Sequence, residues 1–188
     1  KRKISAVNQF LFFLYENEVL DRFYKIKNKE KLPLLTPAYQ EVDLSVLYRE
    51  TEDSKGQLIA LLIVELGLSP SEIIQLKWEN IALEFQVLTV VNEKVMRVLE
   101  IPQLLLPYLE GEHKAVYLFD NKGEAYSRQW LFQKLNYYLA SVDLSQMTAQ
   151  KLREQYIIKE KNKGTAILDL TRKLGLKSPV TLEKYFKN

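Results

Sequence analysis

The sequence lacks cysteine entirely and contains a single histidine, His113. Without thiols the chain can form no disulfide and offers no thiolate to a metal ion or to nucleophilic catalysis. One imidazole cannot build a multi-histidine zinc site, and it argues against a serine–histidine triad. His113 follows Gly111 and Glu112 outside any periodic pattern, so we interpret it as a solvated loop residue. We therefore expect neither a metal ion nor a cofactor.

Long apolar runs and strong charge are also lacking. The longest apolar run, Leu58–Val64, is too short to span a bilayer, and no signal-peptide pattern opens the chain. The net charge of +3 permits an acidic partner without requiring one, and the only dense basic cluster is Lys1–Lys3. With 47% apolar and 27% charged residues the composition is typical of a soluble globular protein. We expect a cytoplasmic protein with no membrane contact.

The chain opens inside an amphipathic pattern. Apolar residues recur at helical spacing from Ile4 to Leu14, and a helix this apolar needs partners to bury it. Because the first residue is Lys, we predict that residues 1–26 are the last helix of a truncated N-terminal helical domain. The charged, proline-containing stretch "KNKEKLPLLTP" indicates a linker over residues 27–37. A second, compact domain is predicted for residues 38–188.

Two helices are predicted at the start of this second domain, over residues 38–50 and 55–67. The second is apolar nearly all round, which favours a central buried helix. Gly67 suits its C-terminal cap, since glycine tolerates the left-handed conformation that often ends a helix.

The tetrapeptide "SPSE" predicts the start of a further helix. Ser69 suits the N-cap, Pro70 the first helical position, and Glu72 completes a capping box. We expect this helix to run to about Trp78. The cap gives Ser69 a structural role that requires no chemistry.

A β-hairpin is predicted from Phe85 to Ile101, because "VLTVV" and "MRVLEI" flank "NEK". It ends at Pro102 and carries Lys94 near its tip. The next segments predict a short helix in "QLLLPYLEG" and a third strand or extended segment in "AVYLF".

Helices dominate the rest of the chain. Ser127 and Thr148 are predicted N-caps of helices over residues 128–140 and 149–161, and Gly175 suits the end of a helix in "TAILDLTRKLG". Ser178 and Pro179 open a last short helix. The predicted fold class is mainly α with a small antiparallel β-sheet, an α+β arrangement.

Four segments in this order carry a family resemblance: "LIALLIVELGLSPSEIIQLKWENI", the hairpin with Lys94, "MTAQKLREQYI" and "LGLKSPVTLEKYF". Together they resemble the catalytic domain of the tyrosine recombinases, the phage-integrase family, and look most like its Xer type. The resemblance runs from about Thr36 to the end of the chain. It implies a tyrosine-recombinase catalytic-domain fold for residues 38–188, and it implies that the opening helix ends a core-binding domain.

The resemblance implies chemistry on the DNA backbone through three residues. Tyr185 matches the nucleophile, whose hydroxyl attacks a phosphate and forms a 3′-phosphotyrosyl link. Arg153 matches an arginine that holds the phosphate oxygens, and Lys94 matches the lysine that protonates the leaving 5′-oxygen. Judged alone, each has an ordinary alternative: a packed terminal aromatic, a surface arginine and a solvated turn lysine.

Three other family positions are degenerate. Ser69 stands where the family has an arginine, Gln150 where it has a histidine, and Leu176 where it has a histidine or tryptophan. A hydroxyl cannot supply a permanently charged, bidentate fork. Losing one preorganised phosphate contact typically costs about 10²–10³ in rate. Strand transfer is therefore predicted to be lost or weak, which favours a protein that is not an enzyme.

Three functions remain open from the sequence. The first is a DNA-binding protein of site-specific recombination and integration, with double-stranded DNA and another recombinase or a second copy as partners. The second is an active site-specific recombinase that recovers the missing arginine from Arg97 or Lys177. The third is a protein-interaction module without DNA binding.

Two further expectations concern single segments. Lys151 and Glu154 are expected to face solvent. Since only residues 186–188 follow the tyrosine, we expect no docking of a helical tail on a neighbouring subunit.

Overall fold

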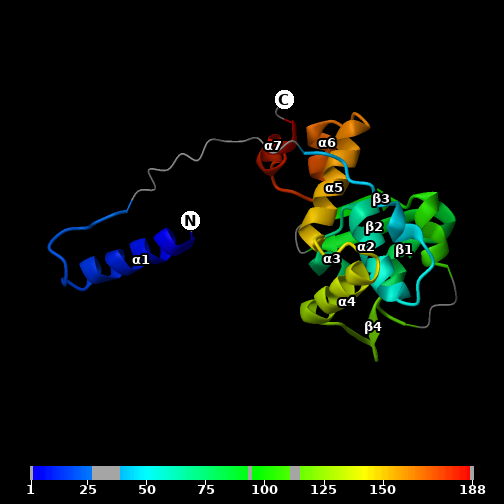
Figure 1. Cartoon of the computed structure of the whole chain (residues 1–188), viewed down its shortest axis with the longest axis horizontal. Coiled ribbons are helices and arrows are strands. Elements are labelled where there is room, and N and C mark those ends of the chain that lie inside the picture. Colours follow the sequence, from blue (N-terminus) through cyan, green and yellow to red (C-terminus); the bar gives the residue numbers. More distant parts are fainter. Residues whose placement is uncertain (1, 27–38, 93–94, 111–114, 187–188) are drawn as a thin grey trace. The chain divides into compact units, whose positions relative to one another are not determined.

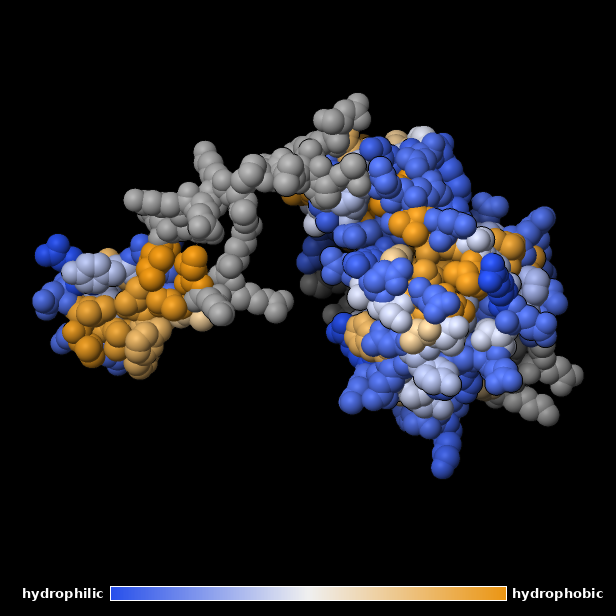
Figure 2. All heavy atoms as spheres, in the orientation of Figure 1, coloured by the Kyte–Doolittle hydropathy of each residue, from blue (hydrophilic) through white to orange (hydrophobic). Residues whose placement is uncertain are grey.

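The computed structural model describes residues 2–26, 39–92, 95–110 and 115–186, and the chain divides into two units, residues 1–38 and 39–188. In the first unit, helix α1 (Arg2–Glu16) forms where the helical pattern was predicted. The Asn8 side chain exchanges two hydrogen bonds with the backbone of Ile26, at 2.8 and 3.0 Å. Hydrophobic side chains gather on the surface of this unit (Figure 2), and Phe10 and Phe13 of α1 are both exposed. Its assignment to an N-terminal domain stays a prediction.

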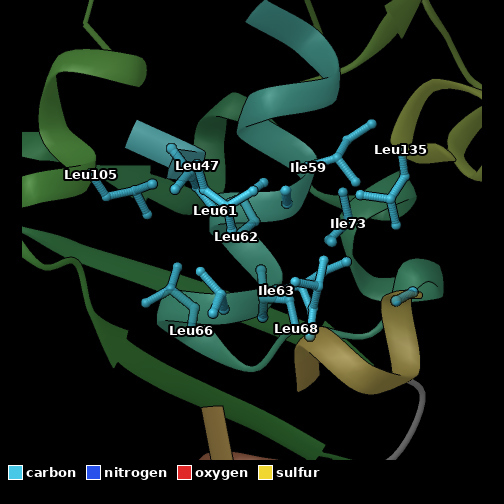
Figure 3. Packing of buried hydrophobic residues seen from close by; sticks show 14 of the residues in the cluster. Leu47, Ile59, Leu61, Leu62, Ile63, Leu66, Leu68, Ile73, Leu105 and Leu135 are labelled. Atoms are coloured by element: carbon cyan, nitrogen blue, oxygen red, sulfur yellow. The ribbon is translucent and has the colours of Figure 1, made fainter. Parts of the chain in front are cut away.

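The second unit is built around helix α2 (Ser54–Leu66), which lies at its centre in Figure 1. Helices α4 (Arg128–Ser141) and α5 (Ala149–Asn162) both pack against it. Its side chains are buried on almost every side, as the sequence predicted, and Figure 3 shows Ile59, Leu62 and Ile63 inside the core. Gly67 ends the helix in the left-handed conformation at φ 64°, which confirms its predicted capping role.

A three-stranded antiparallel sheet lies beside the helices, in the order β1 (Ile81–Ala82), β2 (Val87–Asn92), β3 (Val95–Glu100). The predicted hairpin is confirmed, with Val90 opposite Arg97. The third strand is β1, whereas residues 115–119 consist of bends around one isolated bridge from Tyr117 to Lys77. A second small hairpin, β4 (Asp120–Asn121) and β5 (Glu124–Ala125), was not predicted.

The helix predicted over residues 38–50 is wrong. Residues 39–44 have no regular structure, and only a 3₁₀ turn, η1 (Ser45–Tyr48), follows them. The backbone N–H of Val42 donates to the Gln155 side chain at 2.8 Å, and that of Ser45 donates to Asp43 at 2.9 Å. These side-chain acceptors replace the carbonyls that a helix would have used.

The helix opened by Ser69, α3 (Pro70–Gln75), ends three residues before the predicted Trp78. At Leu76 the backbone turns extended, and its carbonyl accepts a hydrogen bond from Leu118, while Trp78 donates to Val116. Pairing with the 115–119 segment therefore ends the helix early. The short helix predicted after Pro102 is the 3₁₀ helix η4 (Gln103–Tyr108).

The C-terminal elements form a second apolar cluster against α5. They are α6 (Ile167–Lys173), the 3₁₀ turn η5 (Pro179–Thr181) and α7 (Glu183–Phe186). The predicted caps Ser127 and Thr148 accept hydrogen bonds from Trp130 and Lys151. Gly175 follows α6 at φ 62°, again in the left-handed region. The architecture is mainly helical with a small antiparallel sheet, as predicted.

Candidate functional site

Ser69 forms the N-cap of α3, and the predicted capping box is present. Its hydroxyl accepts a hydrogen bond from the backbone N–H of Glu72 at 3.4 Å, and its own N–H donates to Glu72 Oε2 at 2.7 Å. Both residues line a surface pocket of about 520 Å³ together with Ser71 and Gln75. The Ser69 side chain, at the position where the family has an arginine, thus satisfies a backbone donor at the start of α3.

Arg153 lies in the second turn of α5 and binds the ends of two other helices. Its Nε donates to the carbonyl of Gly67 at 2.8 Å, and its Nη2 donates to the carbonyl of Leu174 at 3.2 Å. These residues cap α2 and α6, where the helix dipole favours a cation. Burial lowers the pKa of the Arg153 guanidinium, although the group stays charged at neutral pH.

Tyr185 lies in α7 and is 4% exposed. Its hydroxyl donates to Glu154 Oε1 at 3.0 Å, and its ring lies 4.5 Å from that of Tyr39. The Lys184 ammonium lies 3.5 Å from the same Glu154 oxygen and 4.5 Å from the centre of the Tyr185 ring. Burial raises the pKa of the Tyr185 phenol; Lys184 opposes this in part, and the hydrogen bond to Glu154 adds to it.

Arg153 and Tyr185 line one pocket of about 530 Å³. Leu176, a degenerate family position, lines it as well, together with Lys184, Thr181 and several apolar side chains. The pocket does not include Ser69, which lines a separate pocket on α3. The structure therefore brings two of the predicted site residues together.

Among the described residues, the other predicted site residues do not line this pocket. Gln150 lies exposed in the first turn of α5. Lys94 lies outside the described residues, and so does His113. The predicted convergence of Lys94 with Arg153 and Tyr185 stays a prediction.

Sequence reasoning missed the role of one acidic residue and underrated another. Glu154 was expected to face solvent, but its side chain is 26% exposed and accepts the Tyr185 hydroxyl. Glu72 was assigned to the capping box alone, yet its second oxygen accepts from Arg97 Nη1 at 2.7 Å. A signal for the second pair was available, because strand alternation puts Arg97 on the same buried face as Leu99.

The described part of the chain contains neither a candidate metal-binding cluster nor a candidate membrane-spanning helix. Its aspartate and glutamate side chains form no group of three that could hold a metal ion. None of its helices is long and apolar enough to cross a membrane.

Comparison with solved structures defines the class of fold. The chain matches the XerA recombinase with a TM-score of 0.67 and 16% identity, covering 98% of this chain and 69% of that one. It matches the Tn1549 transposon integrase in complex with a circular intermediate DNA at a TM-score of 0.68 and 12% identity, over 100% of this chain and 74% of that one. The XerH site-specific recombinase bound to its difH substrate matches at a TM-score of 0.63 and 19% identity, over 89% of this chain and 55% of that one. The fold is that of a tyrosine recombinase or integrase.

Sequence comparison identifies the family. The chain is 97% identical to a Streptococcus mutans protein described as "Tyrosine recombinase XerD-like", over all of this chain and 77% of that protein. A Streptococcus uberis protein of the same description is 50% identical over all of this chain and 76% of its own length. No family model matches the chain. The chain belongs to the XerD-like tyrosine recombinases, as the motif order predicted.

Proposed function

We propose that this chain binds duplex DNA as a protein of site-specific recombination, and that its own strand-transfer chemistry is lost or weak. Membership of the XerD-like tyrosine recombinases supports the first part. So do the folds of the XerH recombinase and the Tn1549 integrase, whose structures contain DNA. The net charge of +3 is compatible with a polyanionic ligand.

The state of Tyr185 carries the second part of the proposal. A phenol must lose its proton to attack phosphorus, and burial raises the pKa of Tyr185 and so disfavours the phenolate. Lys184 opposes this effect in part, whereas the Glu154 carboxylate, 3.0 Å from the hydroxyl, also raises the pKa. This carboxylate would also repel a phosphate that approaches the hydroxyl, because two anions in a partly buried site interact strongly.

The side chains at the two family positions for phosphate-binding arginines have other partners in this structure. Arg153 has two of its nitrogens on backbone carbonyls, so part of its hydrogen-bonding capacity is already used. Ser69 offers a hydroxyl that caps α3 and no positive charge. Loss of one preorganised phosphate contact typically lowers a rate by about 10²–10³. These features together favour binding over cleavage.

A covalent-trapping experiment tests the chemistry. The 188-residue chain and its Tyr185→Phe variant are incubated with a nicked duplex from which the cleaved end diffuses away. The two proteins are then compared on a denaturing gel. We expect the same gel for both, with no covalent adduct. An adduct formed by the parent and absent from Tyr185→Phe would establish the active recombinase instead. That alternative is favoured by one observation, the pocket that Tyr185 shares with Arg153.

A salt titration tests DNA binding. We expect the logarithm of the association constant for a duplex to fall linearly with the logarithm of salt concentration, with a slope of about −0.9 for each phosphate contacted. Arg153→Lys keeps the charge but loses the planar fork, so it should weaken binding more than Lys151→Arg on the exposed face of the same helix. Salt-independent or absent binding would reject DNA as the ligand and favour the protein-interaction module.

A further inference from the structure

Arg97 occupies a place where an apolar residue is the rule. On β3, Arg97 and Leu99 face inward, whereas Met96 and Val98 face solvent and are 73% and 60% exposed. The Arg97 side chain is only 8% exposed. Removing a guanidinium from water is strongly unfavourable unless other groups compensate. The contacts of Arg97 must therefore account for its burial.

Two of its three guanidinium nitrogens have partners. Nη1 donates to Glu72 Oε1 at 2.7 Å, and Nε donates to the carbonyl of Lys173, at the end of α6, at 2.8 Å. The third nitrogen, Nη2, is buried and has no hydrogen-bond partner. A buried donor left unpaired is destabilising, because it loses its hydrogen bonds to water without replacement. A purely structural ion pair between β3, α3 and α6 explains Nη1 and Nε but leaves Nη2 unexplained.

A second guanidinium lies beside the first. Arg97 Nε binds the carbonyl of Lys173, and Arg153 Nη2 binds the carbonyl of the next residue, Leu174. Burial lowers the pKa of Arg153 and the charge of Arg97 adds to this effect, whereas the Glu72 carboxylate raises the pKa. Glu72 is the carboxylate that pairs with Arg97, while Arg153 forms no ion pair among the described residues. Two like charges with one counter-charge leave the cluster electropositive, which is the arrangement that attracts an anion.

The carboxylate of Glu72 links this cluster to the start of α3. Its Oε2 accepts the backbone N–H of Ser69, and its Oε1 accepts Arg97 Nη1, each at 2.7 Å. The Glu72 carboxylate thus connects the Arg97 guanidinium to the backbone of position 69, where this chain has a serine in place of a cation. Lys177, the other residue considered for this role, is exposed on the turn after α6.

We propose that Arg97 and Arg153 together bind one backbone phosphate of duplex DNA, with Arg97 supplying the positive charge that Ser69 does not. A phosphate oxygen is the acceptor for the unpaired Nη2, and a planar guanidinium fork matches two phosphate oxygens. This inference rests on the proposed DNA-binding function and identifies the cation that serves it. Because Nη2 is enclosed, binding requires a local displacement. A Cβ added at Gly175 would lie 2.7 Å from Arg97 Nη1, so the turn after α6 packs against the guanidinium and we expect this turn to move.

Four variants of the 188-residue chain test the proposal by duplex binding over a range of salt. Arg97→Met should lower the affinity at least about tenfold and reduce the salt slope by about one phosphate contact. Arg172→Met removes the same charge from an ion pair whose side chains are 79% and 58% exposed, so it should leave the slope nearly unchanged. In Ser69→Arg/Arg97→Met the new arginine starts next to Glu72, and we expect the affinity and slope to return toward those of the parent.

The fourth variant separates binding from folding. Arg97→Met leaves Glu72 buried without its partner, whereas Glu72→Gln/Arg97→Met removes both charges and should keep the fold, as judged by circular dichroism and thermal unfolding. We expect it to show the same reduced slope as Arg97→Met. The role of Arg97 would be overturned by a parental slope in Arg97→Met and Glu72→Gln/Arg97→Met, by an equal loss in Arg172→Met, or by no rescue in Ser69→Arg/Arg97→Met. A parent that binds no DNA would instead overturn the proposed function, and this inference with it.

Discussion

Replacing Gly67 by alanine should destabilise the core of the second unit for two separate reasons, backbone strain and a steric clash. Gly67 has φ 64°, where a residue with a Cβ is strained by roughly 1–2 kcal/mol. The added Cβ would also lie 2.5 Å from the ring of Tyr156 and 2.8 Å from Leu174 Cδ2. Forcing an extra methyl group into a packed core typically costs about 1–3 kcal/mol. We expect Gly67→Ala to lower the free energy of unfolding by about 2–5 kcal/mol.

Gly164→Ala is the matched control. Gly164 also follows a helix and has φ 86°, but no atom lies within 4 Å of the added Cβ. It should therefore show the backbone strain alone, about 1–2 kcal/mol. Urea denaturation followed by circular dichroism measures both variants. The difference between them isolates the steric term, and equal losses of stability would refute the close packing of Gly67 on Tyr156.

The same pair of variants also tests the contact between Gly67 and Arg153 in the candidate site. The carbonyl of Gly67 accepts Arg153 Nε at 2.8 Å, so a displaced turn at Gly67 also displaces the guanidinium. We expect Gly67→Ala to weaken duplex binding at a salt concentration where Gly164→Ala binds like the parent. Unchanged binding by a folded Gly67→Ala would show that the phosphate contact does not depend on this carbonyl.

Three further predictions follow from local contacts. Ser69→Ala removes the cap of α3 and should cost about 1 kcal/mol in urea denaturation, whereas Ser69→Gly should cost only a few tenths. Tyr138→Phe deletes a buried hydroxyl that donates to the carbonyl of Leu47 at 2.9 Å, and we expect a loss of about 1 kcal/mol in the same assay. Burial raises the pKa of Tyr138 to about 12, so the folded chain keeps a proton that the unfolded chain releases near pH 10. The contribution of Tyr138 to stability should therefore be constant below about pH 10 and fall as the pH rises toward 12, as measured by denaturation of the parent and Tyr138→Phe at several alkaline pH values.

The elements predicted correctly are those specified by neighbouring residues. The capping box needs only Ser69 and Glu72, three residues apart, and the left-handed caps need only a glycine at the end of an apolar pattern. The hairpin follows from two β-rich runs with a short turn between them. The helix predicted over residues 38–50 failed because its backbone is bound by Gln155, which lies more than a hundred residues away. Local propensity carries no information about such a partner.

The candidate site shows the same limit. Motif order placed Arg153 and Tyr185 in one site, and they do line one pocket. The contact of Tyr185 with Glu154 spans 31 residues and joins α7 to α5, so it depends on how two helices pack. A glutamate one residue after an arginine is usually solvated on a helix surface. Its role at the tyrosine could therefore be found only from the folded chain.

Glu72 explains why a correct local interpretation was still incomplete. A capping box accepts glutamine as readily as glutamate, since either side chain accepts the N-cap N–H. Burial alone would raise the pKa of this carboxyl, yet the hydrogen bonds from Arg97 and Ser69 lower it below its usual value. A glutamine at position 72 would satisfy Ser69 and leave the Arg97 guanidinium buried without a counter-charge. The need for a charged residue at position 72 thus comes from the strand and not from the helix that it caps.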